Sequence, residues 1–317
     1  MSNGYKWDIP HLKTHLQYAV DLELWTIPFY MSAMYSVKDP SSVAYRLIQS
    51  VVYQEMLHVE LAGNVANSYG FSPLFPPPVY QGQNIPHLNF QLDTPDPTKI
   101  YQPYSAEIGP LDEKRINAMC LIEYPEWDTG HQPDLEEDIN QYGSIGEFYD
   151  AVEVGSTQLA DNIKGNINQV NFFQHYYNNF TQPTITKNGV QGLSQVMNLI
   201  KAIVDQGEGK TAGDVDVQNE YQNTADGFYE EWSHYKKFTF IRDLEQRPIT
   251  YSGVPNPEPG TPGYEAQQIL IKNFTAFREA MEKLFRGEDP GRFDSYMATL
   301  GGNILTCWQK GAIPKFS

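Results

Sequence analysis

The stretch Val51-Val52-Tyr53-Gln54-Glu55-Met56-Leu57-His58-Val59-Glu60 places a glutamate and a histidine three residues apart within a segment of helical periodicity. Positions three and four residues apart lie on one face of a helix. The residues on this face are mostly apolar: Ala44, Leu47, Val51, Glu55, His58, Ala62, Val65 and Tyr69. Glu55 and His58 are therefore expected to face the core, where an unpaired carboxylate is costly and favours a cation partner. A Glu-x-x-His pair on an inward face has the ligand spacing of two-metal carboxylate bundles.

The same pattern recurs in other segments with helical periodicity. Glu23 interrupts an apolar stripe in residues 11–37, and Glu208 lies on the apolar row of residues 191–208. In residues 220–243 a second pair, Glu231 and His234, lies three apart on an apolar face. The sequence therefore predicts four helices that each direct an acid inward, two of them with a histidine one turn further on. These side chains match the ligand set of a dinuclear carboxylate site.

The chemical types of these expected ligands limit which metal ions the site can hold. Carboxylate and imidazole ligands without thiolate suit iron or manganese, whereas zinc suits such an oxygen-rich site less well. We therefore expect two iron ions, with manganese as the alternative, and no catalytic side chain beyond the ligands. Nearby aromatic residues are expected to form the walls of a substrate pocket: Trp25, Phe29, Tyr30 and Tyr53. Glu60, Glu123 and Glu230 are interpreted as structural or solvated, and the histidines other than His58 and His234 as ordinary.

Composition excludes several functions. The chain has 317 residues, 40% of them hydrophobic and 13% aromatic, which is typical of a globular protein. A net charge of −17 argues against binding to nucleic acid or to an anionic membrane surface. Two distant cysteines, Cys120 and Cys307, form no disulfide framework. No signal peptide or membrane span is evident, so we expect a cytoplasmic protein.

Periodicity predicts further helices at 41–69, 112–123, 144–164 and 264–285, with another helical segment after residue 291. Residues 71–110 are rich in proline and are expected to form a long crossover loop that serves as a cover or a pocket wall. Residues 165–190 are expected to form short strands or loop. We expect a bundle in residues 1–245, with an insertion at about 71–190, and an extension in residues 246–317 packed on the bundle.

Five motifs resemble one family: residues 22–28 (LELWTIP), 54–58 (QEMLH), 145–149 (IGEFY), 203–209 (IVDQGEG) and 231–238 (EWSHYKKF). They resemble the ferritin-like family that includes the iminophenylpyruvate dimer synthases of violacein and rebeccamycin biosynthesis. The resemblance covers roughly residues 11–245. It implies a mainly α, ferritin-like four-helix bundle with long loop and helix insertions and an appended C-terminal helical segment. It also makes Glu147 an alternative to Glu208 as a ligand; the other would support a ligand or contact substrate.

Three functional hypotheses follow. The first is a dinuclear iron or manganese oxidoreductase that uses O2 or peroxide on a small organic substrate, in amino-acid-derived secondary metabolism if the resemblance extends that far. The second is iron storage or detoxification, which the long insertions disfavour. The third is a non-catalytic ferritin-like binding module, in which Glu55 and Glu231 would pair with basic residues that the stripes do not contain. Substrate, electron donor and oligomeric state stay open, and a homo-oligomer is compatible with the sequence.

Overall fold

Two long antiparallel helices form the centre of the molecule. The computed structural model describes residues 6–92, 96–125, 142–172, 183–207 and 232–317. Helix α1 (Ile9–Ser36) begins at Asp8, whose side chain accepts a hydrogen bond from the His11 amide. Helix α2 (Val43–Ser68) begins in the same way at Ser42. Most of both helices is buried, because other helices cover the pair on both sides.

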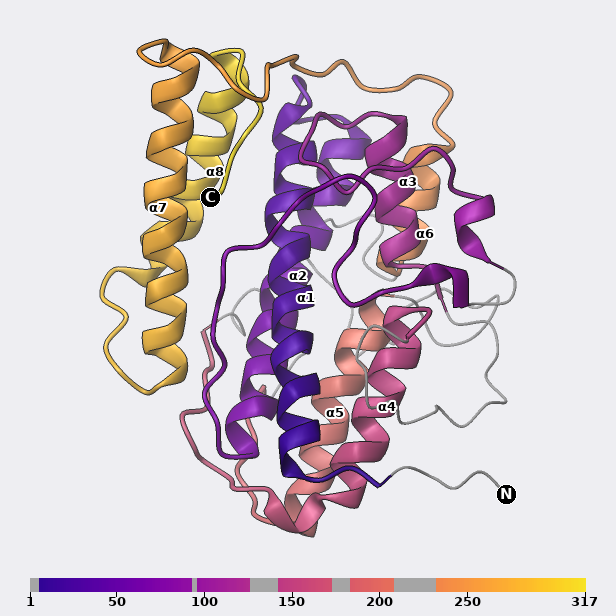
Figure 1. Cartoon of the computed structure of the whole chain (residues 1–317), viewed down its shortest axis with the longest axis vertical. Helices are drawn as coiled ribbons and strands as arrows, with labels where there is room; N and C mark the ends of the chain where they lie inside the picture. Colours follow the sequence, from indigo (N-terminus) through magenta and orange to yellow (C-terminus); the bar gives the residue numbers. More distant parts are fainter. Residues whose placement is uncertain (1–5, 93–95, 126–141, 173–182, 208–231) are drawn as a thin grey trace.

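Four shorter helices complete the bundle: α3 (Glu113–Ile122), α4 (Ile145–Gln158), α5 (Val190–Gly207) and α6 (His234–Arg242). Figure 1 shows α3 and α6 side by side along one half of the α1–α2 pair, and α4 and α5 along the other half. The third and fourth positions of the bundle are thus each occupied by two helices in succession. Their inner ends meet beside the middle of α1 and α2, and these ends supply the functional site.

The C-terminal segment is a helical hairpin that packs on the outside of the bundle. Helices α7 (Pro262–Phe285) and α8 (Phe293–Gln309) lie against each other, and α8 lies against α1. The indole nitrogen of Trp308 donates to the Ser32 carbonyl over 3.0 Å. Gly63 of α2 faces the ring of Phe285, and a Cβ at this glycine would lie 2.3 Å from a ring carbon.

The mainly α fold expected from the sequence is confirmed. Short 3-10 helices at Phe90–Leu92, Pro97–Lys99 and Ala160–Asn162 are the other regular elements of the described chain, which holds isolated β-bridges but no strand. Helix α4 lies inside the predicted insertion, yet it packs against α1 and α5 as part of the bundle. Among the described residues, no helix is both long enough and apolar enough to cross a bilayer.

Candidate metal centre

Five ionisable side chains meet at the inner ends of the short helices. Glu23 comes from α1, Glu55 and His58 from α2, Glu123 from the residue that ends α3, and His234 from the first residue of α6. Their exposed fractions range from 0 to 4%. Potential ligand atoms of Glu55, His58 and His234 all lie within 4.8 Å of one another. Such a concentration of buried acids is costly unless cations or protons balance it.

The Nδ1 atoms of both histidines face the carboxylates. His234 Nδ1 lies 2.9 Å from Glu55 Oε1 and 3.4 Å from Glu123 Oε2. His58 Nδ1 lies 3.4 Å from Glu23 Oε2 and 3.9 Å from Glu55 Oε1. The two imidazole rings are stacked, with centroids 5.3 Å apart. Glu55 therefore lies between the two histidines, as a bridging carboxylate would.

The opposite nitrogen of each imidazole is held by a glutamine. His58 Nε2 lies 2.8 Å from Gln206 Oε1, and His234 Nε2 lies 3.0 Å from Gln54 Oε1. The ammonium of Lys237 also donates to Gln54 Oε1, over 3.4 Å, which identifies this atom as the acceptor oxygen. With Nε2 of each ring facing a glutamine oxygen, the Nδ1 atom of each ring is left to face the carboxylates as a ligand atom.

This arrangement fits a metal ion. His234 Nδ1 is buried and has no hydrogen-bond partner among the described residues, although a carboxylate oxygen lies 2.9 Å away. A lone pair that faces a carboxylate oxygen is repelled unless a cation or a proton lies between them. Metal-bound histidines usually donate their other N–H to an oxygen acceptor, as both histidines do.

Each carboxylate has one oxygen occupied by a hydroxyl group. Tyr149 donates to Glu23 Oε1 and Thr26 donates to Glu55 Oε2 over 2.7 Å. Tyr30 donates to Glu123 Oε1 over 2.6 Å. The remaining oxygens are the three that face the histidines. Three carboxylate oxygens and two imidazole nitrogens thus point inward, held by donors on their outer sides.

Burial and neighbouring charge control the protonation of this cluster. Burial, followed by the charge of Glu123, raises the pKa of Glu55 well above its usual range, although His58 partly opposes this shift. Burial acts to lower the pKa of His58, but the adjacent Glu23 and Glu55 carboxylates outweigh burial and raise it. Burial and the nearby carboxylates raise the pKa values of Tyr30 and Tyr149, so both stay protonated donors.

A small cavity adjoins the cluster. Its volume is about 10 Å³, and the carboxylates line one side of it. The other side is formed by the apolar residues Ile145, Ile203 and Val204 together with Gly207. A Cβ at Gly207 would lie 3.0 Å from Glu123 Oε2, so glycine leaves room there that a side chain would fill. The cavity accommodates about one water-sized species.

The structure brings together Glu23, Glu55, His58 and His234, which were expected as ligands. It does not bring Glu147 to the cluster. Glu147 Oε2 accepts from the Gly143 amide over 2.7 Å, and the Glu147 amide donates to Ser144 Oγ over 3.0 Å. This pair of bonds resembles a capping box at the start of α4, with the carboxylate bound to the residue before the N-cap, and it keeps the carboxylate at the helix end. The other two expected ligands, Glu208 and Glu231, lie outside the described residues.

Glu123 corrects the sequence interpretation, which took it to be structural or solvated. It is 4% exposed and faces His234. The sequence contained an indication that Glu123 is buried, because it lies on the same helical face as Ile116, Met119 and Cys120, all of them buried. The sequence analysis also did not identify Gln54, Gln206, Thr26 and Tyr149 as supports of the cluster.

The expected aromatic pocket is not assembled around the carboxylates. Tyr30 contacts the cluster, but Trp25 and Phe29 stack on each other and on Tyr80. Tyr53 is half-buried and accepts a hydrogen bond from Gln49. The reason is helical geometry: Trp25 follows Glu23 by two residues and points to the opposite side of α1.

Comparisons with known proteins agree with this architecture. A family model described as Ferritin-like matches residues 16–243. A crystal structure of a ferritin-like protein from Caulobacter vibrioides, at 1.95 Å resolution, is similar to this chain with 47% sequence identity and a TM-score of 0.87. The similarity covers 98% of this chain and 99% of that one. No curated protein matches the chain.

Proposed function

Because this chain belongs to the Ferritin-like family, we propose that its buried cluster holds two iron ions, with manganese as the alternative. We further propose that the loaded protein is an oxidoreductase that acts on a small organic substrate with O2 or peroxide. The observation that carries this proposal is the arrangement of the five inward-facing ligand atoms. The other oxygen of each carboxylate accepts a hydrogen bond from a tyrosine or threonine hydroxyl, and the Nε2 atom of each histidine is hydrogen-bonded to a glutamine oxygen.

The described residues divide into ligands and supports. Glu23, Glu55, Glu123 and the two histidines would hold the ions. We propose Glu231 as the sixth ligand from its place in the sequence, three residues before His234. This pair differs from Glu55 and His58, which share one helix, because α6 begins at His234 with Ser233 as its N-cap. Bound iron would supply one-electron redox steps and an open position for O2 or peroxide. The supporting hydroxyl and amide groups keep the ligands oriented, which preserves affinity and geometry through turnover.

The apolar side of the cavity has a separate role. Ile145, Ile203 and Val204 exclude bulk water from one face of the cluster. Their side chains offer no acid or base, so proton movement near the ions falls to the carboxylates, the histidines and the two tyrosines. Tyr30 and Tyr149 each donate a hydroxyl hydrogen bond to a ligand carboxylate, as Thr26 does.

The resemblance in five motifs supports a finer proposal for the substrate. We propose an amino-acid-derived substrate of the kind handled by iminophenylpyruvate dimer synthases, converted in the cytoplasm as a step of secondary metabolism. The motifs that carry this resemblance include the Glu-x-x-His segments at 54–58 and 231–238. They define the metal ligands more closely than the substrate, so the metal test comes first.

Metal loading tests the proposal. The full chain is stripped with a chelator, reloaded with Fe(II) without oxygen, and its bound iron is measured before O2 is admitted. We expect two iron ions per chain, followed by O2 consumption. The Glu123→Gln variant should bind fewer than two iron ions per chain. The matched control Glu147→Gln should still bind two, because the Glu147 carboxylate caps α4 and does not face the cluster.

The outcomes separate the alternatives. A wild-type chain that binds no stoichiometric iron or manganese would overturn the metal site. Two bound irons without O2 or peroxide consumption would retain the site and remove the oxidoreductase proposal. Iron uptake that continues far beyond two per chain, together with a large closed assembly in light scattering, would indicate storage.

A further inference from the structure

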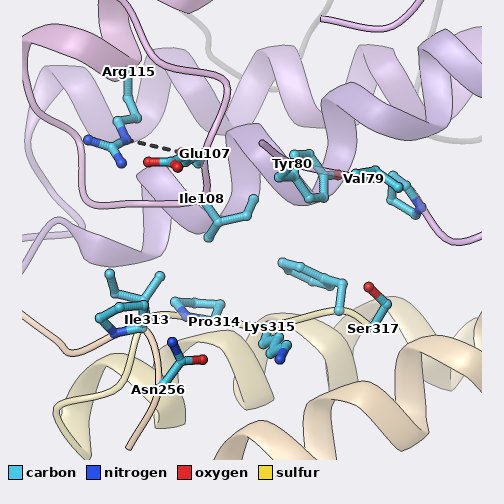
Figure 2. Close-up of a pocket in the computed structure, with 13 residues that line it drawn as sticks. Val79, Tyr80, Glu107, Ile108, Arg115, Asn256, Ile313, Pro314, Lys315 and Ser317 are labelled. Atoms are coloured by element: carbon cyan, nitrogen blue, oxygen red, sulfur yellow. Dashed lines mark hydrogen bonds between the residues drawn. The ribbon is translucent and has the colours of Figure 1, made fainter. Parts of the chain in front are cut away.

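A second pocket lies on the other side of α1 from the metal cluster. Its volume is about 550 Å³, within the range of small-molecule sites. One wall comes from residues 78–80, 107–108 and 115 of the bundle, and the other from residues 255–256 and 313–317 of the C-terminal segment. Figure 2 shows these two walls facing each other across the gap. The pocket and the cavity at the cluster share no residue.

Hydrogen bonds to backbone carbonyl groups fix both walls. Trp25 Nε1 donates to the Val79 carbonyl and the Tyr80 hydroxyl donates to the Trp25 carbonyl, each over 2.8 Å. On the facing wall, the Ile313 amide donates to the Val254 carbonyl over 3.0 Å, and Gln267 donates to the Ile313 carbonyl over 2.7 Å. The pocket is therefore formed before any ligand enters, which lowers the entropic cost of binding.

Arg115 is oriented within the bundle wall. Its side chain is 13% exposed, Nε donates to the Glu107 carbonyl over 3.1 Å, and Nη1 donates to Asp112 over 2.9 Å. Nη2 has no hydrogen-bond partner in the part of the chain that the structure describes. Gly109 provides the space for this guanidinium, because a Cβ there would lie 2.5 Å from Arg115 Cζ. A guanidinium held in this way is suited to a carboxylate.

An acid lies next to this cation. Glu107 lines the same pocket, and Figure 2 shows its carboxylate beside the guanidinium of Arg115. No ion pair of the Glu107 carboxylate is present among the described residues, so it is available to a positively charged group. Beyond this charged end the walls are mostly apolar, with Ile108 and Tyr80 on one side and Pro314 and Phe316 on the other. Lys315, Asn256 and Ser317 also line the facing wall.

We propose that this pocket binds a free α-amino acid with an apolar side chain. The carboxylate of the ligand would pair with Nη2 of Arg115, its ammonium group with Glu107, and its side chain would lie between Ile108 and Phe316. An α-amino acid carries its ammonium and carboxylate groups on the same carbon atom, and the pocket carries a cation and an anion on neighbouring side chains. A simple carboxylic acid would meet the repulsion of Glu107, and a simple amine that of Arg115.

Calorimetric titration of the full chain tests this proposal with three probes: L-phenylalanine, 3-phenylpropionate and 2-phenylethylamine. The last two lack the ammonium and the carboxylate, respectively. We expect saturable binding of L-phenylalanine with a Kd of about 1 mM or lower, and weaker binding of the other two. No saturable binding of L-phenylalanine up to about 10 mM would overturn the proposal, as would tighter binding of 3-phenylpropionate.

Two variants locate the site. Glu107→Gln should weaken L-phenylalanine binding several-fold and leave 3-phenylpropionate unchanged or bound more tightly, because a like charge is removed. Arg115→Met should weaken L-phenylalanine binding at least tenfold. The control Glu245→Gln removes an exposed acid that does not line the pocket. It should leave the binding of both L-phenylalanine and 3-phenylpropionate unchanged. Binding that is insensitive to Glu107→Gln would contradict the assignment even if Arg115→Met fails to fold. The titration uses metal-free protein, so its result is independent of the metal proposal.

Discussion

At the scale of single residues, the cluster depends on groups that bind no metal. Gln206 accepts the Nε2 proton of His58 and thereby directs Nδ1 toward Glu23 and Glu55. Replacing Gln206 by Leu removes this acceptor, so the ring is free to rotate or to change tautomer. Loss of such a support typically lowers metal affinity by about 10–100-fold.

We therefore expect Gln206→Leu to weaken iron binding by at least about tenfold in a chelator competition. The matched control is Gln49→Leu on α2, because the Gln49 side chain donates to the Tyr53 hydroxyl and, among the described residues, not to a member of the cluster. Equal affinities in the two variants would show that Gln206 does not orient His58.

Protonation of the cluster gives a prediction with a defined sign. In metal-free protein the pKa values of Glu55 and His58 are both raised by folding. A group of this kind stabilises the fold fully below its unfolded pKa and loses that stabilisation as pH rises through its folded pKa. Metal binding has the opposite dependence, because ions compete with protons for the same atoms.

The difference in melting temperature between metal-loaded and metal-free protein should therefore widen from about pH 5.5 to about pH 8. Scanning calorimetry at constant ionic strength measures both forms. A difference that stays constant or narrows over this range would contradict the protonation of the cluster described here.

At the scale of elements, the helix expected over 220–243 begins only at His234 in the described residues, with Ser233 as its N-cap. Elsewhere periodicity was sufficient to predict where the described helices lie, because each helix buries one face. It was not sufficient to assign every ligand. Glu123 ends the ten-residue helix α3, a segment too short for its stripe to distinguish a ligand from a solvated end. Glu147 belongs to a motif typical of the family, but the capping box uses its carboxylate locally. Such competition between local and tertiary hydrogen bonds is not visible in spacing alone.

The end of α5 provides a test at this scale. Gly207→Ala places a methyl group 3.0 Å from Glu123 Oε2, so the carboxylate must move by a few tenths of an ångström. Gly207 is the last residue of α5, where the preference for alanine over glycine is smaller than the roughly 1 kcal/mol of a helix interior. We therefore expect the stability of the metal-free protein to change little while iron affinity falls. Gly302→Ala in α8 is the control, because no atom lies within 4 Å of its added Cβ. Denaturant titration and chelator competition on both variants separate the two effects; equal iron affinities would contradict this role of Gly207.

At the scale of the whole molecule, the sequence indicated a helical extension but not the surfaces on which it packs. Those surfaces depend on the close approach of α2 and α7. Hydrophobic periodicity identifies the buried face of each helix but does not predict which helix packs against it. Gly63 admits the buried ring of Phe285, and Trp308 donates to the backbone of α1. The hairpin thereby covers α1 on the side away from the metal cluster and supplies one wall of the larger pocket.

Gly63→Ala should disturb this packing without changing the metal ligands. Its Cβ would lie 2.3 Å from the Phe285 ring, which is fully buried and has no room to withdraw. Overpacking of this kind costs about 1–3 kcal/mol, which exceeds the gain of about 1 kcal/mol in helix propensity. We expect a lower free energy of unfolding in urea, with unchanged iron content.

Because the hairpin buries its inner face on α1 and α2, we also expect bundle and hairpin to unfold in one transition. A separate early transition in this variant would instead show that the hairpin unfolds on its own, and an unchanged midpoint would show that Phe285 adapts without cost.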